Sequence, residues 1–439
     1  MSSQTPYQTP LIRRILPWIY AVIFFITAPL LIFYTSGYRY NFKKSVVERN
    51  GTLIVDSLPH GGTVFIDGQD SGEKTPVTFQ QMTPGWHNVK VGKPGYTSWQ
   101  QDVLIRAERV TFSDRVRLWR QGAPTLLSNG SYVRLASDPN RERLLAFEAA
   151  STTAVGWWSP SKRANLVPLA LATSSIPHLS LRWREDGEGV LLGGNDELTQ
   201  SWFVKASNNQ TTIESLPAGR YHISGNALIG VNGSTLLNVD TDQNQIERLI
   251  LSTNIREQSG SISLQTATSS DSLLLSDSSF LGRLFSLPIG GWSIYEWHRP
   301  FLFLADGTRW LGIRLHLGNT PDVMRAEGDY PRWSPDTKHP RAAFVDTHEI
   351  HLWSPDMPET VIWRQSTPIL NAVWNDQGDV LYIADQQQVF ALPIDTLQES
   401  HPVTLGQFDQ VWDIATEGTT LYAVAKQGAQ RGIFTIPAL

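Results

Sequence analysis

The chain has 439 residues and no cysteine, and its 36 Lys and Arg against 41 Asp and Glu give a formal net charge of −5. This length favours two or three domains. The lack of cysteine excludes a disulfide framework, a thiolate metal site and a cysteine nucleophile. The acidic balance argues against a nucleic-acid partner, because affinity for phosphate needs clustered Lys and Arg.

A run of twenty residues without charge, Ile15 to Tyr34, stands near the start of the chain. A lipid bilayer core needs about 20 apolar helical residues. The apolar region of a cleaved signal peptide is shorter, about 7–15 residues, and small residues follow it. This run is longer and ends in bulky Phe33 and Tyr34. We therefore predict a retained transmembrane helix over residues 15–36, with the lipid bilayer as its partner.

The charges that flank this run do not settle its orientation. Two basic residues precede it and three follow it, so that a simple count favours a cytoplasmic C-terminal side. Long domains, however, cross the membrane largely regardless of flanking charge. The region that follows is also rich in Trp and poor in charge. We predict a single-pass protein of the cell membrane with a cytoplasmic tail over 1–14, a linker over 37–50 and extracytoplasmic domains beyond it.

The pattern of apolar residues changes to period two at Gly51, which is typical of β-strands. Strands are expected at residues 51–56, 63–66, 86–91 and 96–105, and a further short extended run begins at Thr75-Pro76. Pro, Gly and Asp-Gly mark the turns between them. The segment predicts a small β-sandwich over residues 51–115. A unit of about 65–70 residues is near the lower limit for a stable core without disulfides or metals.

Ordered motifs in this segment resemble those of the PEGA domain family. They are Gly51-x-Leu-x-Val55, Leu58-Pro59, Gly61-Gly62, Val64-x-Ile-Asp-Gly68, Thr75-Pro76, Pro84-Gly-x-His87 and Lys93-x-Gly-Tyr96. The chain departs from the family's Pro-Glu-Gly-Ala signature, because it reads Pro59-His-Gly-Gly62. The segment Tyr34 to Tyr40 resembles the linker of membrane-anchored bacterial PEGA proteins. The resemblance implies a surface β-module without known catalytic residues and with a role in contacts within the cell envelope.

Three aromatic residues of this unit, Trp86, Tyr96 and Trp99, are candidates for a ligand-binding face on which a sugar ring stacks. The alternative is that they fill the core of a small sandwich or pack on the next domain, since aromatic side chains dominate small cores.

Residues 116–439 show short apolar runs separated by turn residues, and similar units recur along them. The clear units cover residues 181–204, 331–353, 370–393 and 411–437, and weaker ones centre near Asp138, Ser224, Ser269 and Trp297. Trp333 and Trp374 are 41 residues apart, which matches the roughly 40–45 residues of a four-stranded propeller blade. We therefore predict a β-propeller over 116–439, with eight blades favoured over seven.

The Trp-Ser-Pro-Asp step at residues 333–336 resembles the WD40-like, TolB-type propeller repeat, in which Trp packs between blades. A second copy at Trp353 belongs to an inner strand and aligns with Trp158. Closure of the ring removes exposed sheet edges. For that role we expect residues 432–437 to pair with the strand around 115–119.

Signals for chemistry are few. His348 and His351 are three residues apart on an expected strand, so that their rings point to opposite faces. The run Asp240-x-Asp-x-Asn244 lacks the Gly and Glu of a calcium-binding EF-hand and suits a hairpin turn. No Gly-x-Ser-x-Gly elbow or P-loop is present in the sequence. We assign no catalytic, cofactor-binding or metal-binding residue and expect no cofactor.

The favoured function is therefore that of a non-enzymatic, membrane-anchored cell-surface protein. Its propeller would be a binding platform for an envelope protein or a cell-wall glycan, and its PEGA-like module an envelope contact or spacer. One alternative is a structural subunit of an envelope assembly, which predicts an exposed apolar patch. The other is a polysaccharide-active propeller enzyme, which predicts acidic groups with raised pKa at the channel mouth.

Overall fold

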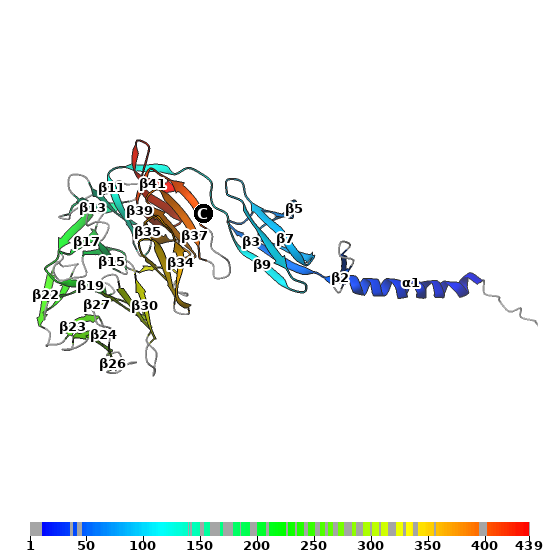
Figure 1. The fold of residues 1–439 in the computed structure, drawn as a ribbon, viewed down its shortest axis with the longest axis horizontal. Coiled ribbons are helices and arrows are strands. Elements are labelled where there is room, and N and C mark those ends of the chain that lie inside the picture. Colours follow the sequence, from blue (N-terminus) through cyan, green and yellow to red (C-terminus); the bar gives the residue numbers. More distant parts are fainter. Residues whose placement is uncertain are drawn as a thin grey trace, which may run out of the picture. The chain divides into compact units, whose positions relative to one another are not determined.

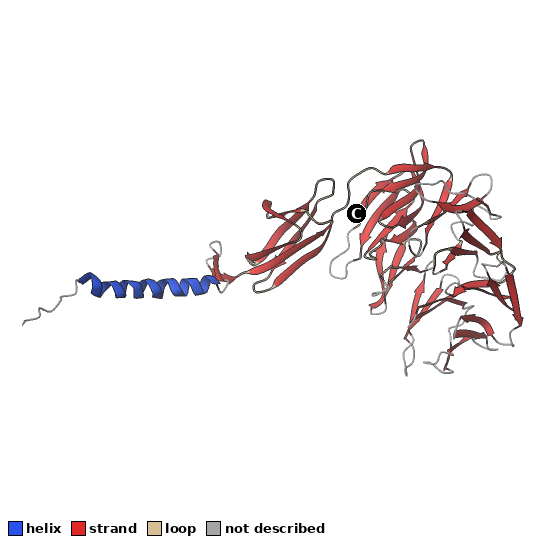
Figure 2. Ribbon diagram, turned by 180° about the vertical axis from the view of Figure 1, so that it is seen from behind, coloured by secondary structure: helices blue, strands red, loops and turns tan. Residues whose placement is uncertain are grey.

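The computed structural model places the chain in two compact units, Met1–Gly122 and Ala123–Ala438. It describes residues 11–438 except 36–37, 42–45, 139, 141–142, 150–152, 159–166, 170–178, 185, 194–199, 208–209, 225–226, 233–234, 241–244, 251–254, 260–261, 267–270, 276–282, 287–292, 299–300, 307–308, 315–321, 328–330, 337–340, 355–356 and 395–401. Strands dominate both units, and the first unit begins with a helix (Figure 2).

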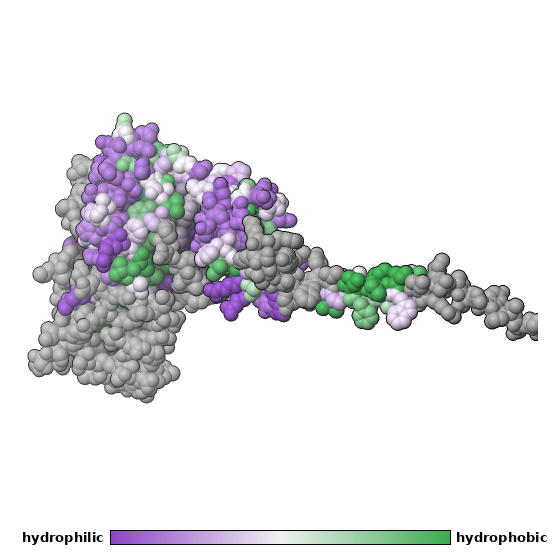
Figure 3. Space-filling model, turned by 45° about the vertical axis from the view of Figure 1, so that its right-hand side comes forward, coloured by the Kyte–Doolittle hydropathy of each residue, from purple (hydrophilic) through white to green (hydrophobic). Residues whose placement is uncertain are grey.

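The helix, α1, extends from Leu11 to Thr35. Its described side chains, at 16–29, 31 and 32, are mostly apolar and exposed, and Trp18 and Phe25 are the most open, with exposed fractions of 74% and 73%. Figure 3 shows hydrophobic colour along this part of the helix. Within the part of the chain that the structure describes, no helix has the length and hydropathy required to cross a bilayer.

A two-stranded hairpin follows the helix. Its strands are β1 (Tyr38–Asn41) and β2 (Val46–Arg49), which run antiparallel and pair Tyr38 with Arg49. The first residue of β1 and the last residue of β2 therefore lie side by side, so the chain enters and leaves the hairpin at the same end.

The first unit contains the predicted β-sandwich. One sheet has the order β6-β3-β9 and the other the order β5-β4-β7-β8 (Figure 1). The strands are β3 (Gly51–Leu58), β4 (Thr63–Ile66), β5 (Gln69–Lys74), β6 (Val77–Met82), β7 (Gly85–Gly92), β8 (Trp99–Ile105) and β9 (Val110–Arg117). Alternate residues point inward, so that Leu53, Val55, Val89 and Val91 form a core with no exposed surface.

Two strands of this unit were not predicted. β5 has no apolar residue, and therefore no period-two signal. β9 lies beside β3 in parallel register, with Thr52 opposite Val110 and Ile54 opposite Phe112. This pairing places residues 110–117 in the sandwich and corrects the prediction that the strand around 115–119 closes the propeller.

In its described residues, the second unit consists of eight four-stranded antiparallel sheets. In chain order we name them blade 1 to blade 8. Blade 1 is β11 (Tyr132–Ser137), β12 (Leu144–Ala149), β13 (Thr153–Trp158) and β14 (Val167–Pro168). Blade 2 is β15 (Ser180–Trp183), β16 (Gly189–Gly193), β17 (Trp202–Ser207) and β18 (Gln210–Ser215). Blade 3 is β19 (Arg220–Ser224), β20 (Ala227–Asn232), β21 (Thr235–Asp240) and β22 (Gln245–Ile250). Blade 4 is β23 (Ile255–Ser259), β24 (Ile262–Thr266), β25 (Asp271–Leu275) and β26 (Arg283–Ser286).

Blade 5 is β27 (Ser293–His298), β28 (Phe301–Asp306), β29 (Arg309–Arg314) and β30 (Asp322–Glu327). Blade 6 is β31 (Arg332–Trp333), β32 (Ala342–Val345), β33 (Glu349–Ser354) and β34 (Met357–Arg364). Blade 7 is β35 (Ile369–Trp374), β36 (Val380–Asp385), β37 (Gln388–Pro393) and β38 (Val403–Gln407). Blade 8 is β39 (Gln410–Glu417), β40 (Thr420–Gln427), β41 (Gln430–Ile436) and, from the start of the unit, β10 (Thr125–Asn129).

Eight sheets confirm the eight blades that the repeats favoured. The ring closes because β10 pairs with β41, and Leu126 lies opposite Phe434. The strand at 430–436 is thus the predicted C-terminal partner, but its N-terminal partner is residues 125–129. The predicted equivalence of Trp158 and Trp353 is confirmed, since each is a buried residue of the third strand of its blade.

The apolar core of this unit lies between blades. One cluster joins Ala343 and Ile350 of blade 6 to Trp374 and Leu381 of blade 7. Other clusters join blades 1 and 2, 2 and 3, 5 and 6, and 8 and 1. A single blade cannot bury both of its faces, so the blades depend on their neighbours for stability.

Candidate functional site

Polar side chains on the first strands of the blades reach the backbone or side chains of the next blade. The Arg134 guanidinium donates to the carbonyl of Leu179, at 2.8 Å. Arg182 donates to the carbonyl of Tyr221, at 2.9 Å. Arg332 Nε donates to Asn371 Oδ1, at 3.0 Å. These contacts connect blade 1 to the segment before blade 2, blade 2 to blade 3, and blade 6 to blade 7.

Asp413 is the most heavily bonded of these groups. Its Oδ1 accepts from Asn371 Nδ2, at 2.6 Å, and from the N–H of Ile414, at 2.8 Å. Its Oδ2 accepts from the N–H of Leu135, at 3.0 Å. One buried carboxylate on β39 therefore joins blades 7, 8 and 1, where the two ends of the second unit meet.

Burial raises the pKa of Asp413 above its usual value. The charge of Arg134 and the hydrogen bonds from Leu135, Asn371 and Ile414 oppose this shift. A buried carboxylate needs such donors, because an unpaired charge in the interior is strongly unfavourable. The Asp413 carboxylate therefore accepts hydrogen bonds from three residues of the protein.

Glu417 and Tyr422 form a second pair in blade 8. The Tyr422 hydroxyl donates to Glu417 Oε2, at 3.0 Å. Burial raises the pKa of Glu417, and the nearby charge of Asp138 adds to this effect. Burial, followed by the negative charge of Glu417, raises the pKa of Tyr422 to about 12. The tyrosine thus remains a hydrogen-bond donor across the physiological pH range.

An arginine and a glycine connect two pairs of neighbouring blades in the same way. Arg341 donates to the carbonyl of Gly378, at 2.5 Å, and Arg143 donates to the carbonyl of Gly187, at 2.7 Å. Each arginine directly precedes the second strand of its blade, and each glycine has a positive φ, 69° and 70°. We call this arrangement the arginine–glycine clasp. It fixes the turn of one blade to the edge of the previous one.

Gly378→Ala is expected to destabilise the propeller strongly. A Cβ at this position would lie 2.1 Å from Ser334 Oγ and 3.2 Å from Pro335 Cδ of blade 6. Gly428→Ala is the matched control, because Gly428 has φ 60° but nothing within 4 Å of its Cβ position. We expect Gly428→Ala to lower the free energy of unfolding by about 1 kcal/mol and Gly378→Ala by about 2 kcal/mol more. Equal losses in chemical denaturation would contradict this.

The structure does not bring the three aromatic candidates of the first unit together on one face. Tyr96 and Trp99 are partly buried against the core of the sandwich. Trp86 is 69% exposed and lies on the outer face, opposite Leu104. Tyr96 also lies between two cations, with Lys93 Nζ 5.4 Å and the Arg120 guanidinium 5.9 Å from its ring centroid.

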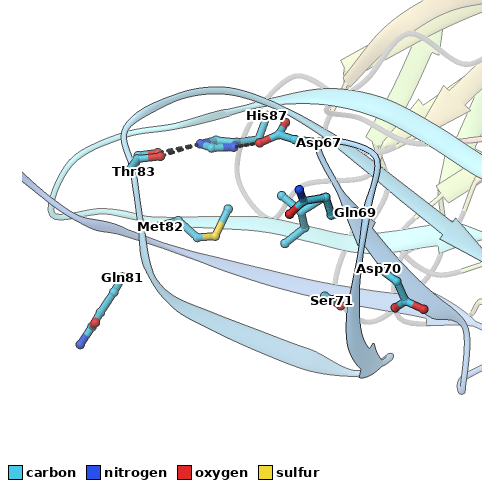
Figure 4. Close-up of a pocket in the computed structure, with 9 residues that line it drawn as sticks. Asp67, Gln69, Asp70, Ser71, Gln81, Met82, Thr83 and His87 are labelled. Atoms are coloured by element: carbon cyan, nitrogen blue, oxygen red, sulfur yellow. Dashed lines mark hydrogen bonds and ion pairs between the residues drawn. The ribbon is translucent and has the colours of Figure 1, made fainter. Parts of the chain in front are cut away.

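A hollow of about 360 Å³ lies between the β4–β5 turn and the β6–β7 turn of the first unit (Figure 4). His87 Nδ1 is 2.7 Å from Asp67 Oδ2, and its Nε2 is 2.8 Å from the carbonyl of Thr83. Both ring nitrogens are thus engaged by protein atoms, and the histidine holds the two turns together.

The residues that we considered for metal binding do not form a site in the described part of the chain. His348 lies in the turn before β33 and not on the strand, and it is exposed. His351 Nε2 is 3.4 Å from Glu349 Oε2. Asp242 and Asn244 lie outside the described residues. Among the described residues, no group of three His, Asp or Glu side chains is arranged to hold a metal ion.

Sequence analysis did not identify Arg134, Arg182, Asn371 or Asp413. The available signal was a polar residue between apolar ones on a strand that is otherwise buried, as in Trp412-Asp413-Ile414. Buried polar groups nearly always have hydrogen-bond partners, so such a residue predicts a contact with a neighbouring strand.

Comparison with known proteins identifies the class of the first unit. Residues 50–116 match the PEGA domain family, which confirms the resemblance of this segment. The chain thus combines a PEGA domain with an eight-bladed propeller. No curated protein matches the chain.

Several solved structures show a weak likeness to this chain. Kluyveromyces lactis Hsv2 is 11% identical, with a TM-score of 0.34, over 56% of this chain and 90% of its own. The U3-55K structure is 10% identical and the RRP9 WD40 repeats are 11% identical. Both have a TM-score of 0.38 over 72% of this chain and 97% of theirs. We conclude nothing about this chain from similarity this low. The propeller assignment rests on the eight sheets and on the pairing of β10 with β41.

Proposed function

We propose that this protein is a non-enzymatic, membrane-anchored binding protein of the bacterial cell envelope. Residues 15–36 anchor it in the lipid bilayer, the N-terminal tail is cytoplasmic, and both folded units are extracytoplasmic. The propeller is a binding platform for an envelope protein or a cell-wall glycan, and the PEGA domain is an envelope contact or spacer.

The anchor proposal is supported by the uncharged run of twenty residues and by the exposure of its apolar side chains. Trp18, Phe25 and Leu31 each have more than 60% of their surface exposed. Exposed apolar surface on this scale is unfavourable in water, and contact with lipid would remove that penalty. Trp18 and Tyr20 near one end, and tyrosines at 34, 38 and 40 near the other, suit the two interfacial zones of a bilayer.

The binding proposal rests on the way in which the buried or partly buried polar side chains between neighbouring blades are used, because they bond to other protein groups. Asp413, a buried carboxylate whose pKa is raised by burial, accepts from three protein N–H groups across three blades. A catalytic acid or base instead has to reach a substrate proton. Because these polar groups hold neighbouring blades together, we infer that the propeller is a rigid scaffold that functions through its surfaces.

Sedimentation with purified cell-wall sacculi tests this proposal. The full-length protein in lipid nanodiscs is mixed with sacculi, and empty nanodiscs are the control. We expect the protein to sediment with the sacculi while the empty nanodiscs stay in solution. Protein that stays in solution would contradict a cell-wall glycan as the ligand. Crosslinking in intact cells would then test the protein partner.

A further inference from the structure

We infer that the end of the PEGA domain nearest the linker is a lipid-contact surface, which binds the headgroup region of an anionic bilayer. We call this end the lipid-side end and define it as residues 49–52, 81–86 and 105–112. The inference rests on the proposed membrane anchor, and it names the partner of the envelope contact.

The strand register places these three segments at one end of the sandwich. Gly51 at the start of β3 lies opposite Met82 at the end of β6. Thr52 lies opposite Val110 at the start of β9. Gly85 at the start of β7 lies opposite Ile105 at the end of β8. Strands of both sheets therefore begin or end here, beside the point where the chain arrives from the linker.

Large apolar side chains are exposed at this end. Trp86 is 69% exposed, Phe112 is 58% exposed and Val110 is 49% exposed. In the sandwich region, 51–122, the one further exposed large apolar side chain is Leu58, which is 36% exposed and lies at the end of β3 away from the linker. Trp86 lies on the outer face of one sheet, and Val110 and Phe112 lie on the outer face of the other. Apolar side chains thus flank the lipid-side end on two sides.

The loop between these flanks is basic. Residues 106–109 read Arg-Ala-Glu-Arg, and all four are exposed. Glu108 forms an ion pair with Arg49 of the linker hairpin, so that its charge is offset within the protein. Arg106 and Arg109 therefore give the lipid-side end a positive charge. Aromatic residues prefer the bilayer interface, and basic residues near a membrane are attracted to anionic lipid.

The linker hairpin shortens the path between the helix and the sandwich, so the lipid-side end cannot lie far from the end of the helix. The linker has fifteen residues between Thr35 and Gly51, but the hairpin pairs Tyr38 with Arg49. Five residue steps and one cross-strand spacing then separate Thr35 from Gly51. This bounds the distance from the last helical residue to the sandwich at about 24 Å. The lipid-side end therefore stays within reach of the headgroups at the end of the anchor.

Single cysteine labels test this contact, because the chain has no cysteine of its own. Ala107→Cys reports on the basic loop. Lys74→Cys is the control at the opposite end of the sandwich, where Lys74 lies opposite Thr63. Phe25→Cys reports on the anchor. Each full-length variant carries a nitroxide label in nanodiscs that contain phosphatidylglycerol, and its exposure to oxygen and to an aqueous nickel complex is measured.

We expect the Phe25→Cys label to be in hydrocarbon, the Ala107→Cys label in the headgroup zone and the Lys74→Cys label in water. Adding Trp86→Ala and Phe112→Ala should reduce the lipid-bound population of the Ala107→Cys label roughly tenfold. The matched control is Leu127→Ala with Val361→Ala, which removes exposed apolar side chains from the propeller and should leave the label unchanged.

The labels distinguish the two ways in which the account could fail. If the Ala107→Cys label is as accessible to nickel as the Lys74→Cys label while the Phe25→Cys label is in hydrocarbon, the lipid contact is overturned and the anchor stands. This result would favour a protein partner for the exposed aromatic residues. If the Phe25→Cys label is in water, the anchor itself is wrong and the lipid contact fails with it.

Discussion

Trp374→Ala is expected to lower the free energy of unfolding of the propeller by about 3–5 kcal/mol. The side chain is 1% exposed and packs between blades 6 and 7. Its indole Nε1 donates to the carbonyl of Arg332, at 2.7 Å, and the Arg341 guanidinium lies 5.6 Å from its ring centroid. The substitution therefore leaves a cavity, an acceptor without its donor and a clasp arginine without its support.

Trp86→Ala is the matched control for this prediction, because it removes the same side chain from an exposed site. It should change the free energy of unfolding by no more than about 0.5 kcal/mol. Urea unfolding followed by circular dichroism compares the two variants. A loss for Trp374→Ala no larger than the loss for Trp86→Ala would contradict the contribution of this Trp to the packing between blades.

Asp413→Ala is expected to have an effect of similar size, about 3–5 kcal/mol. It removes the acceptor of the Leu135 and Ile414 N–H groups and of Asn371 Nδ2, and the first two of these bonds are buried. It also removes the negative charge near Arg134. Because these partners belong to blades 7, 8 and 1, the loss should appear as weaker closure. Faster cleavage of the variant by a protease under native conditions would report such opening.

The effect of Asp413→Ala should also depend on pH. Burial raises the pKa of Asp413 in the folded state above the unfolded value of 3.8. The folded state thus binds this proton more tightly, so the carboxyl contributes most to stability below pH 3.8 and progressively less as the pH rises through the folded pKa. The difference between wild type and variant should therefore be larger at pH 4 than at pH 7.5. A difference that grows as the pH rises would contradict the direction of this shift.

The architecture of the propeller was predictable because its repeats carry a local signal. Each unit repeats a strand that ends near Trp or a polar residue, a tight turn and a buried strand, as in residues 370–384. The 41-residue spacing of Trp333 and Trp374 then sets the period. Such features are short-range, so they are visible in one sequence.

The N-terminal strand that closes the propeller was predicted wrongly, because the correct choice depends on a pairing between segments far apart in the sequence. Residues 110–117 and 125–129 both alternate as short strands near the boundary between the units. The choice between them depends on β3, which takes residues 110–117 as a parallel partner. Parallel pairing between distant segments leaves no local mark in the sequence. β5 was missed for a different reason, since its pairing with β4 needs no apolar face.

The polar contacts between blades could not be assembled from the sequence either. Leu135 and Asp413 are 278 residues apart, and Asn371 and Asp413 are 42 residues apart. A polar residue on a buried strand predicts that a partner exists, but the fold decides which one. The exposure of Trp86 could not be predicted from the sequence either. Trp86 and Trp99 lie in similar strand patterns, but they point to opposite faces of one sheet.

The central claim is that a membrane anchor holds the propeller outside the cell membrane, and labelling in intact cells tests it most directly. Ala429→Cys lies in an exposed turn between β40 and β41 of the propeller. Ser3→Cys lies in the predicted cytoplasmic tail. With a membrane-impermeant maleimide, we predict labelling of Ala429→Cys in intact cells and of Ser3→Cys only after permeabilisation. Labelling of Ala429→Cys only after permeabilisation would contradict the account.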